Sequence, residues 1–563
     1  MNRKLLPIFV LFTGILGALM LLSILGSPSM SVFAGEQSID PVENSSTAGI
    51  LADPATIITV TSGTDPDYSK SFTCYSGTSI RTPCTLRRAI IEASDPGTPR
   101  PVLIKFEIPA EPEEGHDSIL DVWKINLYPY MDIYGIFRVY LHGDITIDGT
   151  TQPGGRSSGP KIILVGPGTG NSEGIKIGET QFQNNHVIRG LGFQNFKNHI
   201  IINSSDNLIE NNWFGVSDDG TDVYLRNDEP EDGSGSSGVA LSDTATNNTI
   251  RNNVFLGFDG VAAAIRGEEN TFSMNYVGTT ADGSVPGKET DSSLICTRFD
   301  WLGGGGISVE GDYHQILDNI FAGLRQEVFK TSTQASAIKV GTTVDGELVI
   351  QDNLIGVDSD GEEVGVCGRG VELSSSPKYI QVESNTIVNP GLSGISLNGE
   401  FFDATTLRSN TIKSNSDWVT ADLNPKPEDA IQIGAGLPDA FAAFNPAIIT
   451  EIDGKTVSGE NGANSACPNC VIELFLDDTD VITEALKSLA VVTANSNGKW
   501  TATLSSNLEN NQGIRTTSTT VKPNTILNMD LGTTTGLSIL YTEGGGPGGG
   551  NQLYMPLVVN NKN

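Results

Sequence analysis

The chain has 563 residues, with 67 acidic and 34 basic side chains and a formal net charge of −33. Such an acidic surface repels phosphates, which argues against nucleic acid and anionic membrane surfaces as partners. The 64 glycines and only 5 histidines indicate a turn-rich β protein with little imidazole chemistry.

The N-terminal segment, residues 1–34, has the features of a secretory signal. Arg3 and Lys4 form a basic start, an apolar run continues to Gly26, and the small residues of SVFAG allow cleavage after Ala34. The apolar run is also long enough to span a bilayer, so an uncleaved anchor is the alternative. Both forms predict an extracellular or cell-surface protein, which would contact a membrane only through that anchor.

Residues 58–100 are predicted to form an N-terminal cap around one helix. In CTLRRAIIEAS, which begins at Cys84, four apolar side chains fall on one helical face. They are Leu86, Ala89, Ile90 and Ala93. This face would cover the exposed edge of the sheet that follows, and a disulfide from Cys84 to Cys74 would hold the helix in place.

Six cysteines in an exported chain indicate disulfides before metal ligands. The predicted pairs are Cys74 with Cys84, Cys296 with Cys367, and Cys467 with Cys470. The last pair lies in CPNC, which could be a redox motif. Because no thioredoxin-like βαβ pattern surrounds it, a structural bridge is favoured.

Residues 101–440 carry a repeat that predicts a parallel β-helix. Three long stretches, NWFGVSDDG, NYVGTTADG and NLIGVDSDG, share an Asn, a Gly and an Asp-Gly pair at fixed offsets. Shorter versions alternate with them, and elements such as GIKI and GISV recur as alternating strands. Strands this short bury a face only when stacked, about 4.8 Å apart, as in a solenoid. A β-propeller is the competing fold, which the unequal spacings disfavour.

The recurring asparagines are interpreted as a structural ladder at one corner of the solenoid. Asn tolerates the left-handed backbone that a sharp corner needs, and stacked amides can hydrogen-bond between rungs. The predicted ladder consists of Asn212, Asn253, Asn275, Asn319, Asn353, Asn385 and Asn410.

Two motifs resemble those of CSLREA-type β-helix proteins exported by bacteria. CTLRRAIIEA is similar to their CSLREAI motif, with Arg88 in place of the usual Glu, and GDITIDGTTQPGG resembles the segment that follows it. The alternating long and short Asn repeats are similar too. The resemblance covers roughly residues 58–435. It implies a right-handed parallel β-helix in an exported surface protein, and no agreed activity.

The pattern changes over residues 445–542, where short alternating strands are joined by Asn-Gly turns. This region is similar to the immunoglobulin-like β-sandwich modules that follow such β-helices. Residues 543–563 begin with a flexible Gly-rich linker. The final LYMPLVVNNKN resembles the tails of exported Chloroflexi-type proteins, which implies a sorting or docking peptide. A single apolar strand is the alternative.

The Asp-Gly pairs of the long repeats raise the question of a metal site. Their turns should lie two rungs, about 10 Å, apart, so Asp219, Asp282 and Asp360 cannot share one Ca²⁺. Pairs within one turn could bind it: Asp218 with Asp219, or Asp358 with Asp360. Asp-Gly at a fixed offset also suits a tight turn. We predict turns and no cofactor, with calcium as the alternative.

The insertions of the long repeats mark the expected binding side of the solenoid. Arg298 and Asp300, beside Trp301, are the candidate catalytic residues, although the same segment could be a loop packed by its own aromatic ring. The favoured function is a non-catalytic surface protein that binds a glycan or another surface protein. The alternatives are a polysaccharide lyase or glycoside hydrolase and a structural sheath component, because fold alone does not establish function.

Overall fold

The computed structural model divides the chain into two units, Met1–Ala52 and Asp53–Asn563. The structure describes residues 53–65, 74, 83–110, 115–127, 143–168, 172–178, 184–224, 236–258, 260–286, 305–324, 336–341, 346–374, 379–398, 404–414, 429–433, 444–461, 467–480, 482–521, 532–543 and 546–547. The predicted signal or anchor segment lies outside these ranges, as does most of the C-terminal tail. No helix within them is long and apolar enough to cross a bilayer.

Three long sheets, here called sheets 1, 2 and 3, make up most of the described chain. Sheet 1 contains β1 (Thr56–Val60), β2 (Val102–Phe106), β5 (Ile145–Asp148), β8 (Val187–Arg189), β11 (Leu208–Glu210), β14 (Thr249–Arg251), β17 (Thr271–Ser273), β20 (Gln315–Leu317), β23 (Leu348–Gln351), β26 (Ile380–Glu383) and β29 (Thr406–Arg408). Sheet 2 contains β3 (His116–Asp117), β4 (Val122–Asn126), β6 (Ile162–Val165), β9 (Leu191–Gln194), β12 (Trp213–Phe214), β15 (Val254–Phe255), β18 (Tyr276–Val277), β21 (Ile320–Phe321), β24 (Leu354–Ile355), β27 (Thr386–Val388) and β30 (Thr411–Lys413). Sheet 3 contains β7 (Glu173–Ile177), β10 (Asn198–Ile202), β13 (Ser237–Leu241), β16 (Val261–Ile265), β19 (Gly305–Val309), β22 (Ile338–Val340), β25 (Val371–Ser374), β28 (Ile395–Asn398) and β31 (Ile431–Ile433).

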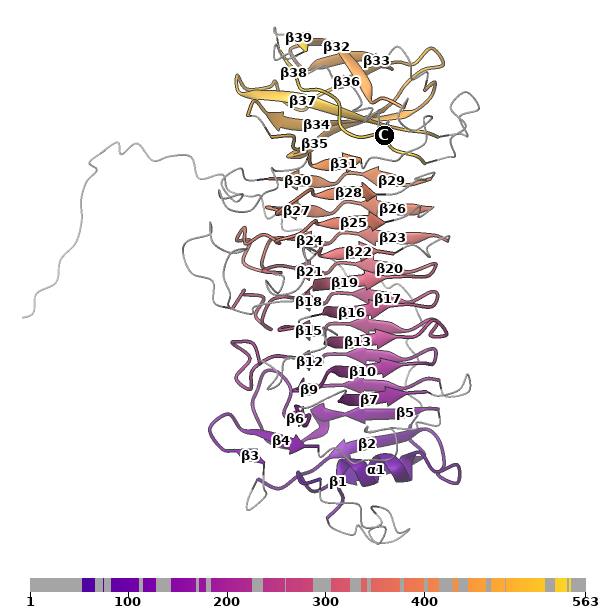
Figure 1. The fold of residues 1–563 in the computed structure, drawn as a ribbon, viewed down its shortest axis with the longest axis vertical. Coiled ribbons are helices and arrows are strands. Elements are labelled where there is room, and N and C mark those ends of the chain that lie inside the picture. The colour runs from indigo at the N-terminus through magenta and orange to yellow at the C-terminus, as the bar shows by residue number, and fades with distance from the viewer. Residues whose placement is uncertain are drawn as a thin grey trace, which may run out of the picture. The chain divides into compact units, whose positions relative to one another are not determined.

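Successive turns of the chain pass through the sheets in one order, so that each strand pairs with the strand one turn later (Figure 1). The pairs are parallel and in register, apart from the antiparallel pair of β3 and β4. Ile188, Ile209 and Ile250, for example, hold equivalent positions in β8, β11 and β14. The prediction of an all-β parallel β-helix is therefore confirmed, while its right-handed sense stays a prediction.

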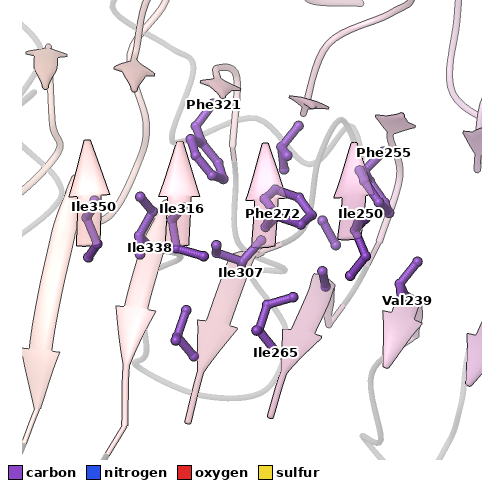
Figure 2. Close-up of a cluster of buried hydrophobic side chains, with 14 of the residues drawn as sticks. Val239, Ile250, Phe255, Ile265, Phe272, Ile307, Ile316, Phe321, Ile338 and Ile350 are labelled. Carbon is purple, nitrogen blue, oxygen red and sulfur yellow. The ribbon is translucent and has the colours of Figure 1, made fainter. Parts of the chain in front are cut away.

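Inward-pointing side chains of the three sheets form one continuous core (Figure 2). Sheet 1 contributes side chains such as Phe272 and Ile316, and sheet 3 contributes Ile307, all almost completely buried. Sheet 2 contributes a row of aromatic rings, in which Phe214 stacks on Phe255 with 4.8 Å between ring centroids. Stacking in this row adds to the hydrophobic gain that makes such short strands stable together.

The seven asparagines proposed as a ladder line the corner between sheets 1 and 2. Asn253 is typical: its Nδ2 donates to Asn275 Oδ1 at 3.1 Å, and its backbone N–H donates to the same oxygen at 2.9 Å. These side chains are almost fully buried. The ladder asparagines do not themselves adopt the left-handed backbone, so that part of the prediction is wrong. The residue before each one does, as at Asn252 (φ 55°), because the ladder residue must direct its amide along the stack.

A second ladder lies at the corner between sheets 3 and 1. Asn207 Nδ2 donates to Asn248 Oδ1 at 2.7 Å, and Asn248 Nδ2 donates to Asn270 Oδ1 at 2.9 Å. His314 ends this row, since its Nδ1 accepts from the backbone N–H of Asn270 at 3.1 Å. This explains a histidine that fits no metal or catalytic pattern.

Two further regions flank the parallel sheets. Helix α1 (Leu86–Ala93) buries the four apolar residues that the sequence places on one face, and it contacts β1. Cys84 forms a disulfide with Cys74. At the other end, two antiparallel sheets form the C-terminal module, in which Cys467 is bonded to Cys470. Sheet 4 contains β32 (Ala447–Asp453), β33 (Thr456–Asn461) and β36 (Lys499–Thr503), and sheet 5 contains β35 (Lys487–Thr493), β34 (Val471–Asp478), β37 (Gln512–Thr519), β38 (Tyr541–Thr542) and β39 (Gly546–Pro547).

Candidate binding cleft over sheet 2

A cleft of about 770 Å³ lies over the outer face of sheet 2 and is called here the sheet-2 cleft. Its floor is one line of outward side chains, Trp213, Val254 and Tyr276, in register across β12, β15 and β18. Its walls are residues 156–161, which precede β6, and the Asp-Gly turns after β12 and β18. The exposed polar groups that line it include Thr150, Ser157, Ser158, Asn211, Thr221 and Asn252.

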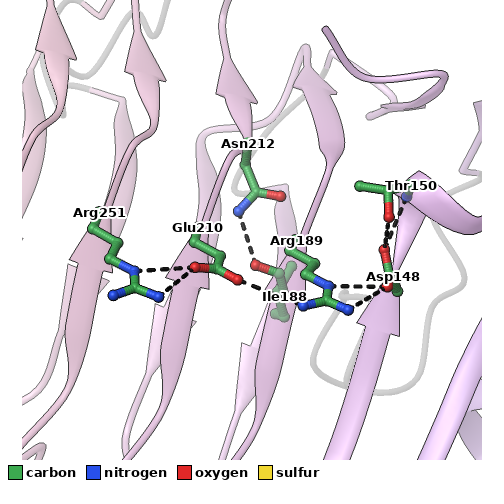
Figure 3. A network of polar contacts seen from close by, with 7 residues as sticks. All are labelled: Asp148, Thr150, Ile188, Arg189, Glu210, Asn212 and Arg251. Atoms are coloured by element: carbon green, nitrogen blue, oxygen red, sulfur yellow. Dashed lines mark hydrogen bonds and ion pairs between the residues drawn. The ribbon is translucent and has the colours of Figure 1, made fainter. Parts of the chain in front are cut away.

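A row of alternating charges runs across sheet 1 and ends at Asp148 (Figure 3). The chain that follows Asp148 leads to the cleft wall formed by residues 156–161. Arg189 Nη2 donates to Asp148 Oδ2 at 2.7 Å, and Arg251 Nη2 donates to Glu210 Oε2 at 2.9 Å. Cross-strand pairs of opposite charge stabilise the sheet register. Asp148 Oδ1 also accepts from the backbone N–H of Thr150 at 3.0 Å and so caps the short 3₁₀ helix Gly149–Thr151.

Arg156 lies over the indole of Trp213, with 4.6 Å from Cζ to the ring centroid. Its Nη1 donates to the backbone oxygen of Asp218, whereas its Nε and Nη2 are buried without a hydrogen-bond partner among the described residues. Burial lowers the pKa of this guanidinium. A Cβ on Gly159 or Gly220, both with positive φ, would lie 2.3 or 2.6 Å from the ring, so both glycines are needed to seat it.

Asp218 ties the first Asp-Gly turn to the solenoid. Its Oδ1 accepts from Gln194 Nε2 at 2.9 Å, and its Oδ2 forms an ion pair with Lys124. These partners belong to β9 and β4, earlier rungs of the same sheet. The carboxylate therefore anchors the turn.

Asp219 and Asp282 close the turns that flank the cleft. Asp219 Oδ1 accepts from Ser217 Oγ at 2.6 Å and from the N–H of Thr221 at 3.1 Å. Asp282 Oδ1 accepts in the same way from Thr280 Oγ1 and from the N–H and Oγ of Ser284. The hydroxyl of Ser217 lowers the pKa of Asp219, and that of Thr280 lowers the pKa of Asp282. Both side chains are therefore ionised acceptors, a state unsuited to a general acid.

The third turn repeats this geometry. Asp358 is buried, and its Oδ1 accepts from the N–H groups of Asp360 and Glu362 at 3.1 and 2.8 Å. The side chain of Asp360 is exposed. Ser359 Oγ donates to the backbone oxygen of Asp282 at 2.7 Å, so the second and third turns touch. Strands β12, β18 and β24 are two places apart in sheet 2, which puts the turns on one side as predicted.

Several predicted residues are not brought together by the described structure. Arg298 and Asp300, the candidate catalytic residues, lie outside the described residues, as does Cys296. Cys367 is disulfide-bonded, but its predicted pairing with Cys296 stays a prediction.

Sequence reasoning missed most of the sheet-2 cleft. Arg156 and Lys161 belong to the segment RSSGPK, which is outside the repeat and has no motif of its own. Trp213 and Tyr276 did have a signal, because each follows a ladder Asn at the first outward position of its strand. An aromatic residue at that position in two of three long repeats could have indicated an outer face with ligand contacts.

Comparisons with known proteins give only distant likeness. No protein-family profile and no curated protein matches this chain. One similar solved structure is the catalytic domain of a GH87 α-1,3-glucanase in complex with nigerose, with 11% identity over 67% of this chain and 69% of that one and a TM-score of 0.30. Others are the Dettilon tailspike protein, with 10% identity over 76% and 89% and a TM-score of 0.35, and a mutant tailspike protein of E. coli bacteriophage HK620 with a pentasaccharide, with 11% identity over 77% and 87% and a TM-score of 0.27. At these TM-scores no argument about function rests on them.

Proposed function

We propose that this chain is an exported surface protein whose β-helix binds a glycan in the sheet-2 cleft without cleaving it. The observation that carries the proposal is the cleft itself. Its volume of about 770 Å³ is within the range of about 300–1,000 Å³ found for small-ligand sites. Its floor is aromatic and apolar while its rim is polar, a combination that fits the faces and hydroxyls of a sugar.

The chemistry of the lining favours binding over turnover. Asp219 and Asp282 are ionised acceptors whose hydrogen bonds hold the turns in place. A glycoside hydrolase needs one carboxylic acid with a raised pKa next to a second carboxylate. Neither of these two residues meets that need, whereas both can accept hydrogen bonds from sugar hydroxyls.

The proposal extends to the rest of the chain. Residues 1–34 would export the protein or anchor it, and α1 would cap the first rung of a right-handed solenoid. The C-terminal module would be an immunoglobulin-like spacer, and the final residues a sorting or docking tail. A sheet with an unprotected edge tends to pair with other chains, which supports a cap at each end.

The test is retention of the purified full chain on a panel of immobilised acidic and neutral polysaccharides. We expect binding to one of them with no new reducing ends and no unsaturated uronate products. Tyr276→Ala should weaken binding about tenfold, the loss expected for an aromatic contact of about 1.4 kcal/mol. Leu354→Ala changes an exposed side chain on the same outward line two rungs further and should leave affinity unchanged.

Other outcomes decide between the alternatives. New reducing ends or uronate products would contradict the non-catalytic part and favour a hydrolase or lyase. Self-assembly without retention on any polysaccharide would contradict glycan binding and favour the sheath hypothesis. Equal loss from Tyr276→Ala and Leu354→Ala would place the ligand elsewhere on the solenoid.

A further inference from the structure

Three carboxylates meet in the C-terminal module, far along the chain from the Asp-Gly turns. Asp477 and Asp478 end β34, and Glu484 lies in the segment that leads to β35. One oxygen of each lies within 4.8 Å of the others. Across the described parts of the chain, this is the one group of three acidic, histidine or cysteine side chains with that spacing.

The segment that carries Glu484 lies against the last rung of the β-helix. Ile412 of β30 and Ala485 exchange both backbone hydrogen bonds, at 2.8 and 3.0 Å. Glu484 Oε1 accepts from the N–H of Ser414 at 2.6 Å, directly after β30. The three carboxylates thus join residues of sheet 5 to a segment held by sheet 2.

The cluster is buried and its negative charge is incompletely compensated. Asp477 is 0% exposed and Glu484 is 3% exposed. Asp477 Oδ2 accepts from Arg515 Nε, but its Oδ1 is buried without a hydrogen-bond partner among the described residues. One arginine therefore faces three carboxylates, and a buried carboxylate oxygen without a partner is unfavourable.

We propose that Asp477, Asp478 and Glu484 bind a Ca²⁺ ion that joins the C-terminal module to the last rung. An all-oxygen ligand set favours a hard cation over zinc or copper. Asp477 Oδ1 gains a partner, and the half-exposed Asp478 leaves room for the waters that complete six to eight ligands. This site is independent of the glycan cleft and of its ligand.

Burial disfavours negative charge on the cluster in the metal-free protein. Burial, and then the charges of Asp477, Asp478 and Asp480, raise the pKa of Glu484 to about 8. Burial raises the pKa of Asp477 to about 6 against the opposing effect of Arg515. A divalent cation would compensate the charge that burial and repulsion disfavour.

The test is calorimetric titration of chelator-treated full-length protein with CaCl₂, together with thermal unfolding in CaCl₂ and in chelator. We expect uptake of one Ca²⁺ per chain with a Kd on the order of 0.1–1 mM, as in extracellular calcium modules. The melting temperature should rise by about 3–6 °C in 10 mM CaCl₂. Asp478→Asn and Glu484→Gln should abolish both effects while unfolding cooperatively in chelator.

Two matched variants locate the ion. Asp453→Asn removes one exposed carboxylate of β32 in the same module and should retain calcium uptake. Asp282→Asn, at an Asp-Gly turn, should retain it as well. Absence of saturable uptake, uptake that survives in both Asp478→Asn and Glu484→Gln, or loss in Asp282→Asn would each overturn the proposal.

Discussion

The Asp-Gly turns of the solenoid and the carboxylate cluster of the C-terminal module both contain aspartate carboxylates, but the surroundings of these carboxylates differ. In the turns, carboxylates accept hydrogen bonds from nearby hydroxyl and N–H groups, as the exposed Asp282 does from Thr280 and Ser284. In the module, Asp477 and Glu484 are buried close to a third carboxylate, and Asp477 keeps one oxygen without a partner among the described residues.

The difference shows what separates a structural carboxylate from a candidate ligand. Local hydrogen bonds lower the pKa of Asp219 and Asp282, so their charge is stable without an ion. Burial and repulsion raise the pKa of Asp477 and Glu484, so their charge needs compensation. The number of nearby N–H and hydroxyl donors therefore matters more than the number of acidic residues.

The largest effect is expected from removal of the arginine in the cluster. Arg515→Met leaves Asp477 without its ion-pair partner in a buried site and should destabilise the metal-free module by about 3–5 kcal/mol. Calcium should restore part of this stability if the cluster binds it. Thermal unfolding in chelator and in CaCl₂ measures both effects.

Lys413→Met is the control for this prediction. It removes an exposed ion pair with Glu363 and should change stability by only about 0–1 kcal/mol, with or without calcium. If Arg515→Met changes stability in chelator as little as Lys413→Met does, the negative charge of the cluster does not depend on Arg515 for compensation, contrary to what its burial indicates.

The second prediction concerns the pH dependence of the metal-free protein. The folded-state pKa values of about 8 for Glu484 and about 6 for Asp477 lie above their ordinary values of 4.5 and 3.8. Between these values the folded state holds protons that the unfolded state has released, so stability falls as pH rises. The contribution is complete below about pH 4 and is lost as pH rises through about 6 for Asp477 and about 8 for Glu484.

Melting temperatures in chelator from pH 5 to pH 8 test this slope. The charged and titratable neighbours that face the two carboxyls are Asp478, Asp480 and Arg515. Glu484→Gln should flatten the curve because the amide cannot titrate. The turn carboxylates Asp219 and Asp282 have the opposite effect on the pH dependence of stability. Their pKa values are lowered, so the stability that they contribute is lost as pH falls below 3.8. A flat wild-type curve between pH 5 and pH 8 would contradict the assignment of raised pKa values.

The solenoid could be predicted because its signals are local and repeated. In the three long repeats the ladder Asn stands at a fixed offset from an Asp-Gly turn, so one rule identified Asn212, Asn275 and Asn353 and the rungs that they start. The second ladder was missed although Asn207, Asn248 and Asn270 each stand five residues before an Asn of the first ladder, and a histidine holds the next position in the row. The sequence analysis placed the left-handed backbone on the ladder Asn, one residue too late. The residue that does adopt it has no constant identity, as Met274 and Asp318 show, so no sequence pattern marks it.

The candidate sites could not be predicted in the same way, because their residues meet only through the fold. Arg156 reaches the backbone of Asp218 from 62 residues earlier in the chain. Glu484 meets the N–H of Ser414 from 70 residues later. Asp477 and Asp478 end an alternating strand, where the sequence favours an exposed turn, yet Asp477 is fully buried. Only the packing of that strand on the last rung distinguishes these aspartates from those of the solenoid turns.

The smallest expected effects come from the third turn, where two neighbouring aspartates differ in structure. Asp358→Ala removes a buried acceptor of two backbone N–H groups and should destabilise the protein by about 1–2 kcal/mol. Asp360→Ala changes an exposed side chain and should stay within about 0.5 kcal/mol. Because the turn carboxylates are satisfied locally, calcium should raise the melting temperature of both variants as much as that of the wild type. A calcium response that disappears in Asp358→Ala or Asp360→Ala would instead assign the ion to this turn, and would reverse the contrast between the two acidic regions.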